Sequence, residues 1–288
     1  MQSKMLVTGS QFIREIKFKL YVKYGVVIPA RNEEMFLKYS LRSLYKQSIR
    51  PVEVVVVDDS SSDRTAVIAE SLGATVVRVK RSFGGNLSGT PYIALLVNTG
   101  LRRLEELELD YVMVSGADCL YPARYVEKLA ERMRRDGVVV ASGVAIGEET
   151  SEYGVRGAGR LIDAEWFKQL GFRYPLNYGF EAWLVLKALS EGRGVRVYGD
   201  LRFTLLRPTR ISARKAYLWG KAMRALNYWW FYALARSLKF LFKSPTLGVS
   251  MIAGFLSLTE PVRDIASFTQ GFQKAIVLNI VKSALHLN

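Results

Sequence analysis

Residues 26–65 read VVIPARNEEMFLKYSLRSLYKQSIRPVEVVVVDDSSSDRT, and this stretch decides the expected fold. Two short apolar runs, residues 24–29 (YGVVIP) and 52–57 (VEVVVV), have the composition of buried strands. Between them, residues 33–48 carry leucines and a tyrosine at the spacing of one helix face. A strand, a helix and a second strand in this order predict an α/β fold with a mostly parallel sheet.

The same alternation continues to about residue 142. We expect helices over 64–72, 92–107 and 122–135, and strands over 75–79, 110–115 and 137–142. Residues 80–91 contain three glycines and a proline, which predicts a loop. The pattern becomes irregular after residue 143 and is helical from residue 211 onward. The sequence therefore predicts a Rossmann-like sheet flanked by helices, followed by a helical C-terminal extension.

The composition excludes several classes of protein. The chain of 288 residues is 50% hydrophobic, which is too apolar for an intrinsically disordered protein. A single cysteine excludes a disulfide framework and a cysteine-rich zinc site. A single histidine, His286, excludes Ser-His-Asp triads and multi-histidine metal sites. The few Gln, His and Cys residues are compatible with a thermophilic source.

The net charge of +15 is concentrated towards the two ends of the chain. Residues 1–24 hold five basic residues against one acidic residue, and residues 25–200 are neutral. Residues 201–259 contain ten Lys and Arg but no Asp or Glu. A neutral body with an acidic Asp58-Asp59 pair argues against a nucleic-acid-binding protein, which needs a basic surface.

Polar clusters follow three of the expected strands. They are Arg31-Asn32-Glu33, Asp58-Asp59 and Ser115-Gly116-Ala117-Asp118. In an open α/β sheet, ligands bind at the carboxyl ends of the strands, so the three clusters together indicate one polar ligand. For a single cluster, the alternative is that Asp58 and Asp63 cap the helices that follow them.

The sequence lacks two glycine-rich signatures of phosphate binding. No G-x-G-x-x-G follows the first strand and no G-x-x-x-x-G-K-[ST] occurs, which disfavours a Rossmann dinucleotide site and a P-loop. A diphosphate would then need cationic charge from a metal or from arginines. Asp118 is a candidate ligand for Mg²⁺ or Mn²⁺, and Arg207 and Arg210 are candidate diphosphate clamps.

Two spacings occur together in the deciding stretch: P-x-x-N-E from Pro29 to Glu33, and V-V-D-D-x-S-x-D-x-T over residues 56–65. With them, the region 24–205 resembles the family 2 inverting glycosyltransferases of the GT-A fold. The resemblance continues through Asn98-Thr99-Gly100-Leu101, Gly116-Ala117-Asp118, and Pro122 to Leu129. It implies sugar transfer from a nucleoside diphosphate donor, with inversion at the sugar carbon.

The resemblance also implies roles for single residues on the donor side. The positions of Pro29, Arg31 and Glu33 line the nucleotide base and ribose in the family. The position of Asp58 hydrogen-bonds the base. Asp118 ends the DXD motif and would coordinate the divalent metal that bridges the two phosphates, with Ala117 beside it in the nucleotide-sugar site. Carboxylates suit these roles because they accept from N–H and O–H groups and ligate hard cations.

This sequence departs from the family at the DXD motif, which reads Gly116-Ala117-Asp118. One carboxylate holds a metal more weakly than two. The alternative is a degenerate, metal-independent or inactive site. Basic side chains at Arg207, Arg210 or Lys215 would then replace part of the missing cationic charge.

Inverting transfer needs a general base for the acceptor hydroxyl. The family places a carboxylate near the start of a helix about sixty residues beyond the DXD motif. Glu181, in Tyr178-Gly179-Phe180-Glu181-Ala182-Trp183, is the carboxylate of the matching stretch. The alternative is a first-turn glutamate that stabilises the helix dipole. An acceptor that is already an anionic phosphate would need no base.

The stretch from Arg156 to Arg160, ahead of Asp163-Ala164-Glu165-Trp166-Phe167, resembles the acceptor-side loop and short helix of the family. Gly159 would let the backbone approach a sugar closely, and the ring of Trp166 would stack on it. A plain turn followed by an amphipathic helix explains the same residues.

These observations divide the chain into three parts. We expect a basic N-terminal segment over 1–23, a glycosyltransferase domain over 24–205 and a basic, aromatic-rich helical region over 206–288. Within the domain, the nucleotide-binding half covers about 24–120 and the acceptor half about 121–205.

The stretch 211–243 is rich in tryptophan, phenylalanine, lysine and arginine. Such a helical surface suits the interface of an anionic membrane, and we expect a cytoplasmic enzyme bound peripherally to the inner face of the cell membrane. The alternative is that these helices pack on the α/β body or on another subunit of a homo-oligomer. Apolar residues 244–259 are too few to span a bilayer.

The sequence thus predicts a glycosyltransferase that uses a nucleoside diphosphate sugar, a divalent metal and a lipid-linked or glycan acceptor. A non-catalytic nucleotide-sugar-binding or scaffold protein with a decayed DXD motif is the alternative. We expect no nucleic acid as a partner.

Overall fold

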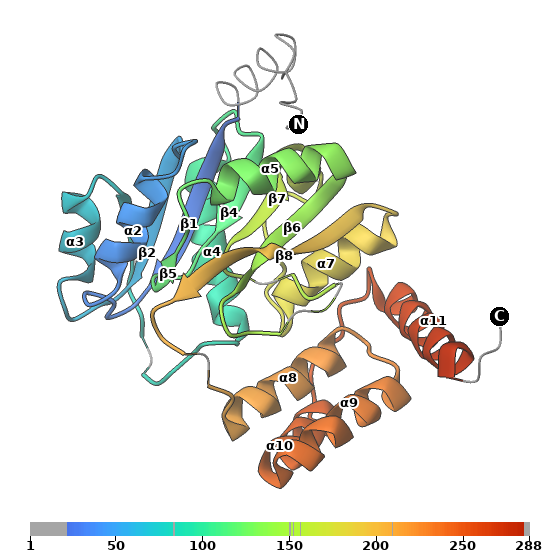
Figure 1. The fold of residues 1–288 in the computed structure, drawn as a ribbon. Helices are drawn as coiled ribbons and strands as arrows, with labels where there is room; N and C mark the ends of the chain where they lie inside the picture. Colours follow the sequence, from blue (N-terminus) through green and yellow to red (C-terminus); the bar gives the residue numbers. More distant parts are fainter. Residues whose placement is uncertain are drawn as a thin grey trace, which may run out of the picture. The chain divides into compact units, whose positions relative to one another are not determined.

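The two apolar runs form neighbouring parallel strands within one eight-stranded sheet (Figure 1). This is seen in a computed structural model, which describes residues 22–82, 84–149, 151, 153–155, 157–208 and 210–284. The basic residues before Val22 and the single histidine, His286, lie outside the described residues.

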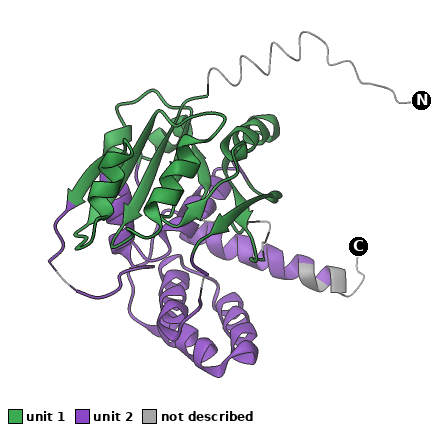
Figure 2. Ribbon diagram, turned by 60° about the vertical axis from the view of Figure 1, so that its left-hand side comes forward, with its two compact units in different colours: residues 1–78, 100–172, 196–206 green, residues 79–99, 173–195, 207–288 purple. Residues whose placement is uncertain are grey.

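The described chain divides into two compact units, and each is described on its own (Figure 2). Unit 1 comprises the residues up to Arg78, then Gly100–Phe172 and Arg196–Leu206. Unit 2 comprises Val79–Thr99, Arg173–Val195 and the residues from Arg207 onward.

The sheet has the strand order β3-β2-β1-β4-β7-β6-β8-β5. The strands are β1 (Tyr24–Ala30), β2 (Glu53–Asp59), β3 (Thr75–Val79), β4 (Tyr111–Val114), β5 (Cys119–Leu120), β6 (Val138–Ala145), β7 (Arg160–Asp163) and β8 (Gly194–Leu205). Strand β1 pairs in parallel with β2 and β4, as the sequence predicts. Strand β7 pairs antiparallel with β4 and β6, and β5 pairs antiparallel with β8.

Helices of unit 1 complete its core. They are α2 (Leu37–Tyr45), α3 (Thr65–Ser71), α5 (Tyr125–Asp136) and α6 (Ala164–Gln169), while α4 (Pro91–Leu104) passes from unit 2 into unit 1. Helix α2 buries Leu37, Leu41 and Leu44 against the strands, which is the face that the sequence predicts. It begins at Leu37, later than residue 33, after a turn in which the backbone N–H groups of Phe36 and Leu37 donate to the Glu33 carbonyl.

Unit 2 is largely helical. Its further helices are α7 (Phe180–Ser190), α8 (Ala213–Ala225), α9 (Trp230–Lys243), α10 (Pro245–Leu256) and α11 (Ala266–Ala284). Helices α8 and α10 cross at Gly220 and Gly254, where an added Cβ would overlap a backbone carbonyl oxygen of the other helix. The helical region predicted from residue 211 onward is therefore confirmed, and glycine is required at its tightest crossing.

Strands β7 and β8 are absent from the sequence-based prediction. In β8, buried residues alternate with exposed ones such as Arg196, Asp200 and Arg202, so no continuous apolar run marks the strand. Such alternation is typical of a strand with one solvated face, and here the antiparallel half of the sheet supplies that setting.

Candidate active site

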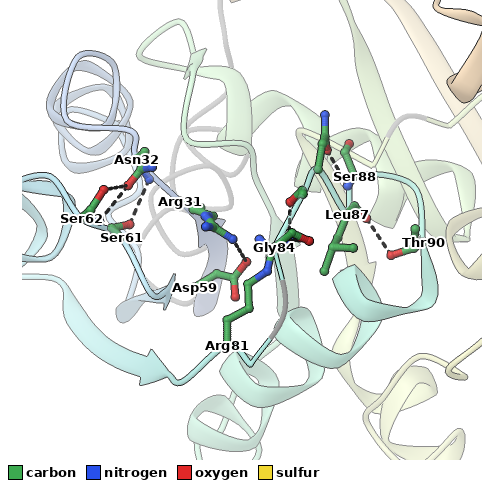
Figure 3. A network of polar contacts seen from close by, with 12 residues as sticks. Arg31, Asn32, Asp59, Ser61, Ser62, Arg81, Gly84, Leu87, Ser88 and Thr90 are labelled. Atoms are coloured by element: carbon green, nitrogen blue, oxygen red, sulfur yellow. Dashed lines mark hydrogen bonds and ion pairs between the residues drawn. The ribbon is translucent and has the colours of Figure 1, made fainter.

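Two loops at the carboxyl ends of β1 and β2 are held together by side-chain hydrogen bonds (Figure 3). The backbone N–H of Asn32 donates to the Ser61 hydroxyl at 2.9 Å, and the N–H of Ser62 donates to the Asn32 side-chain oxygen at 2.9 Å. Asn32 and Ser60 both adopt a left-handed backbone conformation, each with φ of 52°. The parallel pairing of Ala30 with Asp58 brings these loops to one edge of the sheet.

Asp58 and Asp59 end β2 and are both buried, with 5% and 3% of their surface exposed. Asp59 faces the Arg31 guanidinium at 3.9 Å. The Oδ1 atom of Asp58 is buried without a hydrogen-bond partner among the described residues. A buried carboxylate oxygen without a donor is costly, which marks Asp58 as a position for a ligand N–H or O–H group.

Asp63 performs the capping role that the sequence leaves open for both aspartates. Its carboxylate accepts from the backbone N–H of Thr65, the first residue of α3, at 2.9 Å and from that of Glu34 at 3.1 Å. Burial raises the pKa of Asp63, but the hydrogen bonds from Thr65 and Glu34 outweigh it and lower the pKa below its usual value. Capping therefore explains Asp63 and leaves Asp58 without a structural role of this kind.

Pro29 and Glu33 belong to the same edge. Pro29 lies in β1 opposite Val57, so it directly precedes the loop that carries Arg31. Glu33 is 8% exposed, and its carbonyl oxygen accepts from the N–H groups of Phe36 and Leu37 at the start of α2. The structure thus brings the predicted residues Pro29, Arg31, Glu33 and Asp58 together in unit 1.

Asp118 lies in the loop between β4 and β5 and is partly buried. Its backbone carbonyl accepts from the N–H of Leu206, just past the end of β8, at 2.8 Å. At the first position of the motif, the Cβ of any residue in place of Gly116 would lie 3.0 Å from Asp118 Oδ1 and from Cys119 Sγ. A larger residue at position 116 would therefore require one of these side chains to shift slightly, and with glycine at this position the motif has one carboxylate.

Among the described residues, no group of three or more His, Cys, Asp or Glu side chains forms a metal-binding cluster. Asp118 nevertheless fits a divalent cation such as Mn²⁺ or Mg²⁺. Magnesium in nucleotide enzymes is commonly held by one or two carboxylates together with substrate phosphates and water. The donor set of the chain is thus adequate for a metal that arrives with a diphosphate.

The two predicted acceptor-side residues have structural partners in unit 1. Gly159 has φ of 75°, and an added Cβ would lie 2.8 Å from the Tyr125 hydroxyl. Trp166 is 3% exposed, and its backbone N–H donates to the Asp163 cap of α6. Burial of the indole ring favours the alternative of a turn followed by an amphipathic helix for Trp166.

Glu181 lies in unit 2, in the first turn of α7, and its side chain is exposed. Gly179 precedes this helix with φ of 77°. Glu181 lines a pocket with Lys215 and Arg236. The sequence alone indicates Lys215 as a candidate residue of the active site, but not Arg236. Arg207 and Arg210, the predicted diphosphate clamps, are exposed residues between β8 and α8.

The chain has an open α/β sheet, and carboxylates that could bind a ligand follow its parallel strands. Its fold is the GT-A fold of glycosyltransferases. The sequence profile described as glycosyl transferase family 2 matches residues 25–185. The chain belongs to this family, as its sequence predicts.

Solved structures of this fold share little sequence with the chain. The mannosyltransferase PcManGT from Pyrobaculum calidifontis, in complex with GDP-Man and Mn²⁺, superposes with a TM-score of 0.57 at 17% identity, over 96% of this chain and 87% of that one. S. aureus TarS 1-349 in complex with UDP gives a TM-score of 0.51 at 19% identity, over 70% of this chain and 71% of that one.

A shorter match links the chain to a curated relative. The 4,4'-diaponeurosporenoate glycosyltransferase of Staphylococcus haemolyticus is 54% identical over 62 residues, which are 22% of this chain. The match spans 16% of the length of that relative.

Replacing Asp58 by asparagine is expected to weaken nucleoside diphosphate binding about tenfold, because a neutral amide accepts a weaker hydrogen bond than a carboxylate. The free energy of unfolding should not fall, since the amide costs less to bury than an unpaired charge. Calorimetric titration and denaturant unfolding measure the two effects. The control variant is Asp200→Asn. Asp200 lies on β8 and forms an ion pair with Arg132 of α5, so this variant should bind nucleotide normally. Unchanged affinity in Asp58→Asn would remove Asp58 from the site.

Proposed function

We propose that the chain transfers a sugar, with inversion, from a nucleoside diphosphate donor to an acceptor at a membrane surface. The observation that carries the donor assignment is the buried Asp58 Oδ1, which has no hydrogen-bond partner among the described residues. A nucleotide base offers the N–H donor that this oxygen lacks. The solved relatives in complex with UDP and with GDP-Man support this choice of donor.

The remaining donor-side roles follow the same edge of the sheet. Pro29, near the end of β1, and Arg31 and Glu33, in the loop that follows it, would line the base and ribose, since that loop is hydrogen-bonded to the segment after Asp58. Ala117 would lie beside the diphosphate, next to Asp118. Arg207 directly follows Leu206, whose N–H group donates to the Asp118 carbonyl, so it is well placed along the chain to clamp a phosphate together with Arg210.

Asp118 is the residue that would hold a divalent cation. Such a cation, when bound, neutralises charge on the departing nucleoside diphosphate. The solved mannosyltransferase with GDP-Man and Mn²⁺ supports a metal in this fold. Arginine side chains at positions 207 and 210 would supplement a motif that has one carboxylate.

Glu181 is the proposed base. Its carboxylate removes the proton of the acceptor hydroxyl as the acceptor oxygen bonds to the anomeric carbon of the sugar. The bond from that carbon to the diphosphate oxygen breaks, and its electron pair leaves with the nucleoside diphosphate. Attack from the face opposite the leaving group inverts the anomeric carbon, and the proton remains on Glu181 until solvent takes it.

Glu181→Gln should lower the rate constant for transfer by a factor of about 10² to 10⁴, because the amide cannot accept the proton. Nucleotide affinity should be unchanged. Steady-state transfer kinetics and calorimetry measure these two quantities. Glu191→Gln, at the other end of α7, is the matched control and should keep full activity. Full activity in Glu181→Gln would show that another group is the base.

Removal of divalent metal with a chelator tests whether sugar transfer requires it. We expect EDTA to lower the transfer rate at least about tenfold and added Mn²⁺ to restore it, because the diphosphate would lose its counter-charge. Asp118→Asn should require a higher Mn²⁺ concentration for the same rate. Sugar transfer that is unaffected by EDTA would show that the reaction does not require a divalent metal.

Helix α9 supports the membrane part of the proposal. Trp230, Leu234, Leu238 and Phe242 recur every four residues and are 54%, 39%, 39% and 90% exposed. Lys239 and Lys243 on the same helix are exposed as well. An apolar stripe beside basic residues is typical of a helix that lies in the interface of an anionic bilayer. In the part of the chain that the structure describes, no helix is both long and apolar enough to cross a membrane.

The acceptor would then be lipid-linked or a membrane-bound glycan, and the enzyme would work in the cytoplasm at the inner face of the cell membrane. Anionic lipids of the cytoplasmic leaflet attract basic surfaces. The match to a diaponeurosporenoate glycosyltransferase is compatible with a lipid-like acceptor.

Leu238→Glu should lower partitioning onto anionic liposomes about tenfold, because it removes one exposed aliphatic side chain that the bilayer would bury and adds a negative charge. Flotation at low salt measures the bound fraction. Val67→Glu, at an exposed valine of α3, is the control and should float as the unaltered protein does. Unaltered protein that stays in the soluble fraction would refute the membrane proposal.

A non-catalytic nucleotide-sugar-binding protein is a second candidate, favoured by Gly116 at the first position of the motif. Such a protein would bind the donor but would release no nucleoside diphosphate, whichever acceptor is added.

A further inference from the structure

A pocket of about 420 Å³ lies within unit 2. Its walls come from the start of α7, from α8, from the loop that precedes α4 and from α9. All of α8 and all of α9 lie beyond residue 185, where the match to the family profile ends. The C-terminal helices of this chain therefore build a cavity whose occupant the family match does not define.

Specific contacts fix the walls of this pocket. The guanidinium of Arg214, on α8, donates to the backbone carbonyls of Asn86 and Ser88 and thereby anchors the loop before α4. At the start of α7, a Cβ on Gly179 would lie 2.9 Å from Leu226 Cδ1 and 3.0 Å from Ala222 Cβ. The close approach of α7 to α8 thus requires glycine, and the pocket is a built feature of unit 2.

The lining combines an apolar surface with three charged side chains. Ile93, Leu218, Trp219, Met223 and Leu226 are among its apolar residues. The charged residues are Glu181, Lys215 and Arg236, which give the lining a net charge of +1. Ligand pockets typically pair apolar walls with a few polar groups that fix the orientation of the ligand.

We propose that this pocket binds the acceptor, and that the acceptor is an amphipathic molecule with an anionic group next to the hydroxyl that receives the sugar. The proposal rests on the proposed function, because it takes Glu181 as the base. The apolar walls take the hydrocarbon part. Lys215 and Arg236 take the phosphate or carboxylate, and Glu181 takes the hydroxyl beside it.

Three probes separate the parts of this ligand. One is 1-O-decylglycerol 3-phosphate, used below its critical micelle concentration, which carries a chain, a hydroxyl and a phosphate. The second, 1-O-decylglycerol, lacks the phosphate, and the third, glycerol 3-phosphate, lacks the chain. Calorimetric titration of the full chain should give at least tenfold tighter binding of the complete probe than of either part, because each part reaches one half of the lining.

Single alanine substitutions at Lys215 and at Arg236 should each weaken binding of the complete probe about tenfold and leave binding of 1-O-decylglycerol unchanged. Arg224→Ala is the matched control, because Arg224 is an exposed basic residue of α8 outside the pocket lining. Affinity for the nucleoside diphosphate should be the same in Arg236→Ala and Arg224→Ala, which separates the acceptor anion from the donor diphosphate.

Equal affinity for the complete probe and for glycerol 3-phosphate would show a simple anion site and overturn the proposal. Binding that is unaffected in Lys215→Ala and Arg236→Ala, or equally weakened in Arg224→Ala, would place the probe elsewhere and overturn it as well. Because these titrations need no turnover, they separate the two proposals. Probe binding with the predicted pattern but no sugar transfer from any donor would leave the pocket assigned and the transferase function refuted.

Discussion

The parallel pairing of β1 with β2 and β4 positions the polar groups of unit 1. Because the three strands run in the same direction, the loops that follow them meet at one edge of the sheet. Hydrogen bonds between Asn32 and Ser61 and between Glu33 and Thr65 then lock the first two loops to each other. The candidate nucleotide site depends on this arrangement, since a shift of one residue in the register would turn Asp58 to the opposite face.

The neighbouring carboxylates at this edge of the sheet differ in whether they have a partner in the protein. Asp63 and Asp59 have partners in the protein, in the backbone of Thr65 and in the Arg31 guanidinium. Asp58 has a buried oxygen without one among the described residues. Buried polar groups without a partner occur chiefly at functional sites, and this one lies at the carboxyl end of β2, where the nucleotide site is proposed.

The sequence was sufficient for the parallel half of the sheet, because β1 and β2 are continuous apolar runs and the motifs follow them directly. It was also sufficient to choose Asp58 and Glu181 as candidates. It did not predict β8. Buried and exposed residues alternate in this strand, so it has no continuous apolar run, and its pairing with the antiparallel half of the sheet is seen only in the structure. Nor did the sequence connect Arg236 with Glu181, since 54 positions separate them and the packing of α7, α8 and α9 within unit 2 brings both to one pocket. Burial of Trp166 likewise follows from tertiary packing, which composition does not reveal.

The central claim is that the folded chain binds a nucleoside diphosphate sugar at the carboxyl ends of its parallel strands. Thermal unfolding of the full chain with a panel of nucleoside diphosphate sugars, in the presence of Mn²⁺, tests it most directly. A ligand that binds the folded state alone raises the unfolding temperature by mass action. We expect the unfolding temperature to rise by several degrees with the donors of one base, and to rise further with ligand concentration. An unfolding temperature that no member of the panel changes would contradict it.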